Sequence, residues 1–139
     1  MDWITWDASL DTGDAGLDAE HQTLANLFNR LCDAAQGGAG RTACAAALDG
    51  IIEHTRAHFE LEQRMMTQHR YPKIEQHAAE HDMLLRQALD FRNNLAAGGI
   101  DDRSAVVKFA EVWLSFHILF SDKDLGCFVV QATRNSAAP

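Results

Sequence analysis

The stretch from His58 to His81 decides the fold, and it reads HFELEQRMMTQHRYPKIEQHAAEH. It contains two pairs of polar residues that are each four positions apart, namely His58 with Glu62 and His77 with His81. On a helix of about 3.6 residues per turn, residues four apart lie on one face, one turn from each other. Pro72 disfavours helix in the residue before it but can occupy the first turn of a following helix. The stretch therefore predicts two helices that are separated by a break before Pro72.

Both polar pairs lie on the apolar face of their predicted helix. From Ile74 onward the apolar residues follow a helical repeat that also includes His77 and His81, and its members are Ile74, Leu84, Ala88, Phe91 and Leu95. Around His58 and Glu62, the residues on the same face are Ile51, Thr55, Met65 and Met66. We therefore expect the histidines and the Glu62 carboxylate to point into the protein core.

A carboxylate in a core needs a compensating charge. Burial of an ionised carboxylate is unfavourable by several kcal/mol unless it is paired or bound to a metal. No lysine or arginine lies on the inward faces of these two helices, so none is placed to neutralise Glu62. A bound cation is the simplest explanation.

The remainder of the chain predicts further helices of the same kind. With 139 residues it is long enough for one domain with one core, and no segment alternates apolar and polar residues as a strand does. Asp18 is the predicted N-cap of the first helix, and Asp101, Asp102 or Ser104 that of the last. We expect a single domain over 1–139, with an irregular arm at 1–17 that docks Trp3 and Trp6 on the bundle, and helices at about 18–36, 42–68, 73–96 and 102–120.

Short connections between long helices favour antiparallel neighbours, so the predicted fold is an all-α, up-down-up-down four-helix bundle with a short C-terminal segment. In that topology seven polar residues lie in one layer at one end of the bundle: His21, His58, Glu62, His77, His81, His117 and Asp122. His117 and Asp122 are five positions apart, which a regular α-helix cannot place on one face. We therefore predict a wide turn or a local end of the helix just before Gly126.

The number of ligands in this layer favours two metal ions. Five histidines and two carboxylates exceed what one ion requires, and a carboxylate has two oxygens with which to bridge two ions. Imidazole and carboxylate suit iron, zinc, copper or nickel, and iron is the natural choice for so many nitrogen and oxygen ligands.

The composition excludes several classes of partner. The chain has 20 Asp and Glu against 12 Lys and Arg, a net charge of −8, which argues against nucleic-acid binding and favours a monomer. It shows neither a signal peptide nor an apolar run of roughly eighteen residues, so we expect a cytoplasmic protein with no membrane span. Three widely spaced cysteines predict neither a disulfide framework nor a thiolate metal site.

The combined motifs resemble one known family. The residues that carry the resemblance are Asp18-x-x-His21, His58-Phe59-x-x-Glu62 with Met66, Tyr71-Pro72, His77-x-x-x-His81 and His117-Ile118-x-x-x-Asp122-Lys123. This pattern, which extends from Trp6 to about Phe128, resembles the hemerythrins, in particular the single-domain bacterial kind.

The resemblance implies a non-haem centre of two irons with an oxo or hydroxo bridge, which binds O2 reversibly. One iron would take His77, His81 and His117, the other His21 and His58, with Glu62 and Asp122 bridging both. O2 would bind at the second iron, which has one protein ligand fewer. Helical spacing gives the apolar residues expected around that position: Leu24, Phe28, Phe59, Trp113, Leu114 and Ile118.

Three functions are compatible with such a centre. We expect a binding protein rather than an enzyme, for O2 storage, delivery to an oxygen-consuming enzyme, or sensing. The alternative is a di-iron redox enzyme that acts on nitric oxide or peroxide. A store of iron is a third possibility, which seven inward ligands on rigid helices disfavour because release of the metal would leave buried acids uncompensated.

Overall fold

The computed structural model describes residues 8–38, 40–99 and 103–137, and within these ranges it contains helices and no strand. Trp3 and Trp6 lie outside them. The elements are a short 3₁₀ helix η1 (Ala8–Leu10), α1 (Ala15–Gln36), α2 (Arg41–Gln68), α3 (Ile74–Ala96), α4 (Arg103–Phe116), the π-helix η2 (His117–Asp122) and α5 (Lys123–Ala137).

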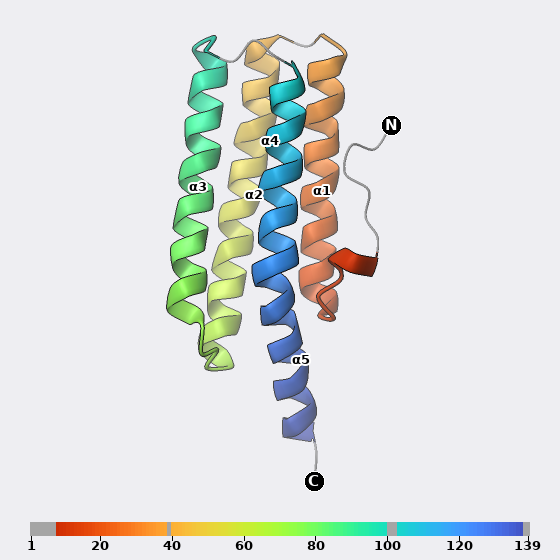
Figure 1. Ribbon diagram of the computed structural model, residues 1–139, viewed down its shortest axis with the longest axis vertical. Coiled ribbons are helices and arrows are strands. Elements are labelled where there is room, and N and C mark those ends of the chain that lie inside the picture. The colour runs from red at the N-terminus through yellow and green to blue at the C-terminus, as the bar shows by residue number, and fades with distance from the viewer. Residues whose placement is uncertain (1–7, 39, 100–102, 138–139) are drawn as a thin grey trace.

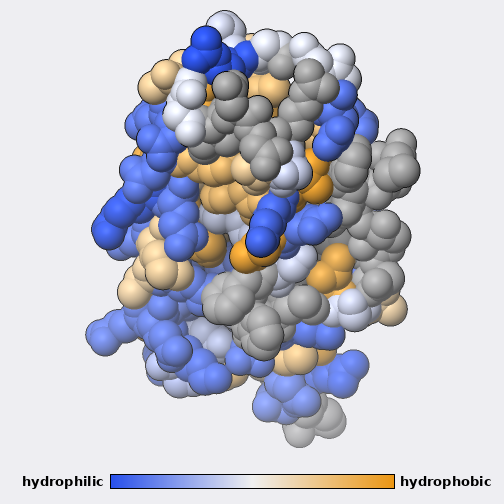
Figure 2. Space-filling model, turned by 45° about the horizontal axis from the view of Figure 1, so that its top comes forward, coloured by the Kyte–Doolittle hydropathy of each residue, from blue (hydrophilic) through white to orange (hydrophobic). Residues whose placement is uncertain are grey.

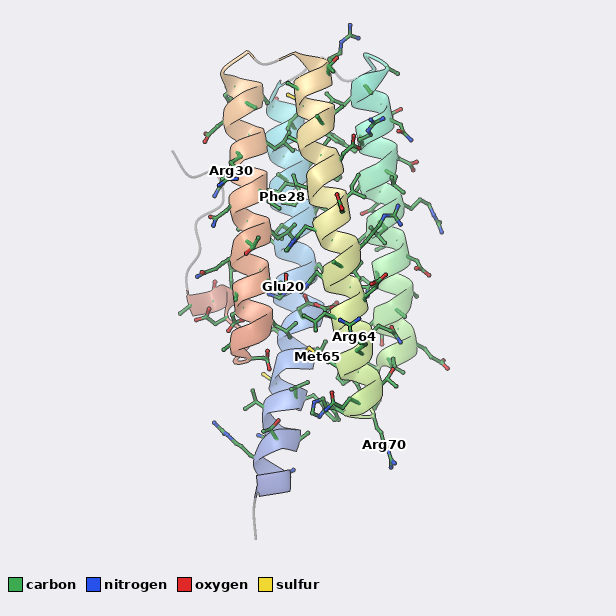
Figure 3. All side chains as sticks on the ribbon, turned by 180° about the vertical axis from the view of Figure 1, so that it is seen from behind. Glu20, Phe28, Arg30, Arg64, Met65 and Arg70 are labelled. Atoms are coloured by element: carbon green, nitrogen blue, oxygen red, sulfur yellow. The ribbon has the colours of Figure 1, made fainter. Side chains whose placement is uncertain are left out.

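Helices α1, α2, α3 and α4 run up, down, up and down beside one another, and α5 continues the line of α4 beyond the end of the bundle (Figure 1). The prediction of an all-α, antiparallel bundle is confirmed. Figure 3 places Phe28 on α1 in one half of the bundle and Met65 towards the far end of α2. These two residues belong to different hydrophobic clusters.

The larger cluster fills the end of the bundle that holds the α1–α2 connection, and Leu31, Leu48 and Ala110 in it have no exposed surface. The smaller cluster lies at the other end and contains Leu17, Met66, Tyr71, Leu125 and Val129. The predicted polar layer lies between the two clusters, so apolar packing encloses it from both ends.

The first helix begins earlier than predicted. Asp14, not Asp18, is its N-cap, and its side chain accepts a hydrogen bond from the backbone N–H of Leu17. Both aspartates lie at the start of the apolar repeat, one before and one just after its first residue, Leu17, so the sequence alone could not separate them. Asp18 has another role, because one of its oxygens accepts hydrogen bonds from the backbone N–H and the hydroxyl of Thr12, both at 2.8 Å. It fastens the N-terminal arm to α1.

The C-terminal part of the chain is also more regular than predicted. Helix α4 begins at Arg103, so Ser104 lies inside the helix and is not its cap, while Asp101 and Asp102 lie outside the described residues. The segment after Asp122 is a 15-residue helix instead of a short capping tail. Helical hydrogen bonding resumes after the π turn, and Leu125 and Val129 then pack in the smaller cluster.

Contacts from the N-terminal arm support the start of α5. The Lys123 ammonium donates a hydrogen bond of 2.7 Å to the carbonyl of Ser9. Gly126 packs directly against Thr12 and leaves no room for a side chain. The arm thus holds the chain immediately after the π-helix, which carries two of the seven polar residues.

Figure 2 shows one face of the molecule, where mostly hydrophilic residues surround a smaller hydrophobic area. Among the described residues, the large hydrophobic side chains that count as exposed are Met83 and Val112. None of the helices in the described ranges is both long and apolar enough to cross a membrane.

Replacement of Gly126 by alanine tests the contact between the arm and α5. The new methyl group would overlap Thr12 and lie 2.7 Å from its carbonyl oxygen, so we expect a loss of about 1–3 kcal/mol in the free energy of unfolding. Gly50→Ala in α2 is the matched control, because nothing lies within 4 Å of that position and a gain of roughly 0.5–1 kcal/mol is expected. Thermal unfolding measures both, and equal melting temperatures for the two variants would contradict the packing described.

Candidate metal centre

The structure brings all seven predicted residues together in one buried layer. Helix α1 contributes His21, α2 contributes His58 and Glu62, α3 contributes His77 and His81, and η2 contributes His117 and Asp122. None is more than 5% exposed, and Glu62 and Asp122 have no exposed surface. The layer therefore contains two carboxylates that are fully withdrawn from water.

Three histidines surround one pair of carboxylate oxygens. Glu62 Oε2 lies 2.9 Å from His77 Nε2 and 2.7 Å from His81 Nε2. Asp122 Oδ1 lies 3.1 Å from His77 Nε2 and 2.9 Å from His117 Nε2. We call this set the three-histidine group.

Two histidines surround the other pair of oxygens. Glu62 Oε1 lies 2.8 Å from His58 Nε2, and Asp122 Oδ2 lies 2.6 Å from His21 Nε2. The two imidazole nitrogens are 3.2 Å from each other. We call this set the two-histidine group. Each carboxylate therefore offers one oxygen to each group, which is the arrangement of ligands that bridge two ions.

Hydrogen bonds among the residues themselves satisfy only part of the layer, since His77 and His81 bond to Glu62 Oε2 and His21 bonds to Asp122 Oδ2. His117 Nε2 and Asp122 Oδ1 are close, yet neither finds a hydrogen-bond partner of acceptable geometry among the described residues, and the same holds for Glu62 Oε1. Buried polar atoms are rarely left without a partner. Three buried atoms that lie within such a layer and have no hydrogen-bond partner are the expected geometry for ligands of a cation, and the imidazole and carboxylate chemistry of the layer suits iron, zinc, copper or nickel.

The π-helix explains how His117 and Asp122 reach the same point. They are five positions apart in the sequence, and a π-helix forms hydrogen bonds between residues five apart, so its wider turn places both side chains on one face. The predicted wide turn before Gly126 is confirmed. It lies where two required ligands conflict with the regular helical period.

Glu80 is a functional residue that the sequence analysis missed. His117 Nδ1 lies 3.0 Å from Glu80 Oε1, and the Ser121 hydroxyl donates a hydrogen bond to the other Glu80 oxygen. Burial would raise the pKa of Glu80, but the hydrogen bonds from His117 and Ser121 hold it below its ordinary value. Such a carboxylate fixes the imidazole so that Nε2 remains available to a metal. The available signal was its place in the HAAEH motif, next to His81.

A polar cavity of about 290 Å³ lies outside this part of the layer. It is lined by Tyr71, Lys73, Gln76, His77, Glu80, Ser121 and Asp124. Glu80 therefore joins the buried His117 to a space that is open to solvent. This cavity is a route by which ions and protons could reach the three-histidine group.

The two carboxylates dominate the electrostatics of the layer. Burial would lower the pKa of His58 and of His77, but hydrogen bonds to Asp122 and Glu62 raise both to about 9. Burial would raise the pKa of Glu62, but the side chains around it, first Asp122 and then the imidazoles of His117, His21 and His58, hold it well below the ordinary value. The two carboxylates therefore favour cations in the layer, whether protons or metal ions.

The apolar residues predicted near the layer lie on the side that faces the larger hydrophobic cluster. Leu24, Phe28, Phe59, Trp113 and Leu114 are all buried in the larger cluster, while the side chain of Ile118 lies outside the described part of the chain. The Phe59 ring stacks on His81, with ring centroids 3.8 Å apart and an angle of 7° between the planes. The Trp113 N–H donates a hydrogen bond of 3.0 Å to the Leu84 carbonyl. These contacts fix the positions of Phe59 and Trp113. We call the five buried residues, Leu24, Phe28, Phe59, Trp113 and Leu114, the apolar wall.

The fold and the site thus define a four-helix-bundle protein whose buried cluster of histidines and carboxylates is able to hold metal. Residues 12–129 match the family model described as the Hemerythrin HHE cation binding domain. The chain belongs to the hemerythrin family.

Two bacterial relatives match over nearly their whole length. A bacteriohemerythrin of Methylococcus capsulatus is 31% identical over 91% of this chain and 96% of its own, and one of Ralstonia nicotianae is 29% identical over 94% and 92%. Among solved structures, a wild-type hemerythrin is 30% identical with a TM-score of 0.80, covering 91% of this chain and 97% of that one. A leucine-to-alanine variant of a hemerythrin gives a TM-score of 0.82 at 29% identity.

The raised pKa values predict how pH affects the metal-free chain. His58 and His77 have pKa values of about 9 when folded and an ordinary value of 6.5, so their protonation stabilises the folded state fully below pH 6.5, and this contribution is lost as pH rises through 9. The lowered pKa of Glu62 acts in the opposite range, and its contribution is lost as pH falls below its ordinary value of 4.5. His81, whose pKa is lowered by burial, gives a smaller opposing effect below pH 6.5.

Urea unfolding of chelator-treated protein between pH 6 and 10 measures this dependence. We expect the free energy of unfolding to fall by a few kcal/mol, since each unit of pKa shift corresponds to about 1.4 kcal/mol. Metal-loaded protein is the control, because metal ions replace these protons and the fall should disappear. A metal-free chain whose stability is constant or rises between pH 6.5 and 9 would contradict the electrostatics described.

Proposed function

We propose that this protein binds O2 reversibly at a centre of two iron ions. The observation that carries the proposal is the division of the carboxylate oxygens between the two histidine groups. Glu62 and Asp122 each place one oxygen beside the three-histidine group and the other beside the two-histidine group, at 2.6–3.1 Å from the nearest imidazole nitrogens. Two ions of the same kind, bridged by both carboxylates, fit this arrangement.

The unequal groups identify the side on which a small ligand would bind. One group offers three imidazoles and the other offers only His21 and His58, while both share the same two carboxylates. The two-histidine group therefore has one protein ligand fewer. An open coordination position is what a metal site requires in order to bind an exogenous ligand.

The donor set favours reversible binding over cleavage of the O–O bond. When bound, two iron ions would supply the two electrons that O2 accepts and would recover them on release. Five neutral imidazoles with only two carboxylates give a small net charge, which a buried apolar site tolerates, whereas a larger number of anionic ligands stabilises iron of higher valence. Glu80, through His117, adds one further negative charge outside the ligand set.

The apolar wall above the layer supports the same function. Leu24 and Phe28 follow His21 on the inner face of α1, and both are at most 3% exposed. An apolar shell around a metal site limits the access of water and protons, and so slows side reactions of a bound ligand. These two residues follow His21 by about one and two turns, so they lie next to the two-histidine group, where the open position would be.

The relatives named bacteriohemerythrin support the proposal by their similarity over more than nine-tenths of this chain. Reversible binding would serve O2 storage, delivery to an oxygen-consuming enzyme, or sensing. The same centre in an enzyme acting on nitric oxide or peroxide would consume its substrate in each cycle. The two functions differ in whether an oxygenated form persists.

An absorption spectrum of iron-loaded protein tests the proposal. The protein is reduced with dithionite, exposed to air and then flushed with argon, with iron counted per chain. We expect two irons per chain and a charge-transfer band that appears in air and disappears under argon. His21→Leu should retain less than two irons and lose the band, because the two-histidine group then has a single imidazole. Irreversible conversion of the wild-type protein to an oxidised form would exclude a carrier and favour a redox enzyme.

A further inference from the structure

Thr55 carries a buried hydroxyl that has no hydrogen-bond partner among the described residues. The residue is fully buried on the inward face of α2. Two other helical threonines behave differently: the hydroxyls of Thr23 and Thr133 donate to the carbonyl four residues earlier, at 3.1 and 2.9 Å. This back-bond is the ordinary solution for threonine in a helix. Thr55 does not adopt it.

The position of Thr55 follows from the register of α1 and α2. These helices are antiparallel, and His21 Nε2 lies 3.2 Å from His58 Nε2, so the two histidines form one level of the bundle. Leu24 lies three residues after His21 on α1, and Thr55 lies three residues before His58 on α2. Both are displaced by about one turn in the same direction. Thr55 therefore faces Leu24 on the level directly above the two-histidine group.

That level is otherwise apolar. Apart from His21 and His58, the buried residues within about one turn of Leu24 on α1 and of Thr55 on α2 all belong to the larger hydrophobic cluster, and they are Leu24, Ala25, Phe28, Ile51, Ile52 and Phe59. A hydroxyl buried among such residues without a partner is destabilising, and valine would fill nearly the same volume without that cost. A hydroxyl at this level is therefore poorly explained by packing. It is explained by a small ligand that binds next to the hydroxyl and forms a hydrogen bond with it.

We propose that the Thr55 hydroxyl forms a hydrogen bond with a small ligand bound at the two-histidine group. The inference rests on the proposed function and adds the residue that sets ligand affinity at that site. The ligand class is a molecule of two or three atoms with a hydrogen-bonding end atom, such as dioxygen or azide. A hydroxyl can donate a hydrogen bond to such an atom or accept one from it. The same residue can therefore bond to a protonated or an unprotonated ligand.

Azide binding to the oxidised, iron-loaded protein tests this role without a measurement of oxygen turnover. We expect Thr55→Val to raise the azide Kd about 10-fold, as expected for loss of one hydrogen bond to an anion, and Thr55→Ser to stay within about threefold of the wild type. Thr23→Val is the matched control, because it removes an exposed hydroxyl and should leave the azide Kd unchanged.

Melting temperatures give a second readout that separates a ligand contact from a structural one. Without azide, Thr55→Val should melt at or above the wild-type temperature, because no internal hydrogen bond is lost. Saturating azide should then raise its melting temperature less than that of the wild type. A fall of more than about 3 °C without azide would show that the hydroxyl has a structural partner, and would overturn the proposal.

The remaining outcomes distinguish the two hypotheses. If the wild-type protein holds two irons and binds azide, while Thr55→Val binds azide with the same Kd, the role of Thr55 is wrong and the proposed function stands. If the wild-type protein does not hold two irons, both the proposed function and the role of Thr55 are wrong. If it holds two irons but binds no azide, the role of Thr55 is wrong, and the absorption spectrum in air decides the proposed function.

Discussion

Two carboxylates with no exposed surface, Glu62 and Asp122, impose the constraint on which the rest of the structure depends. Each ionised carboxylate withdrawn from water requires a positive charge or several hydrogen bonds nearby. Here the compensation comes from five imidazoles, whose nitrogens converge on the carboxylate oxygens from α1, α2, α3 and η2. Protons meet the requirement in the metal-free chain and metal ions meet it when they are bound, so metal binding and folding stability are linked.

This constraint also explains the irregular parts of the chain. His117 and Asp122 can share a face only across a π turn, so the fourth helix departs from regular geometry where both are needed. That turn is held from outside by Glu80, which contacts His117 and Ser121, and the chain that follows it is held by the arm through Lys123. The irregular turn is thus supported at both ends by contacts from distant parts of the sequence.

Local spacing was sufficient to predict the bundle and the seven polar residues that meet in it. The i,i+4 pairs in α2 and α3 define a helix face without tertiary information, and the five-residue spacing of His117 and Asp122 predicts an irregular turn. Contacts between distant segments could not be predicted in this way. Asp14 and Asp18 are equally good caps by sequence, and only the arm, which bonds Thr12 to Asp18, separates them. The role of Glu80 likewise depends on the π turn, which brings His117 within 3.0 Å.

The central claim is that Glu62 and Asp122 bridge two metal positions, and anomalous diffraction at the iron edge from crystals of iron-loaded protein tests it most directly. The account predicts two peaks per chain, separated by about 3.5–4 Å. One should lie among His77, His81 and His117 and the other beside His21 and His58, with one Glu62 oxygen next to each. A single peak, or two peaks with both Glu62 oxygens on the same one, would contradict the account.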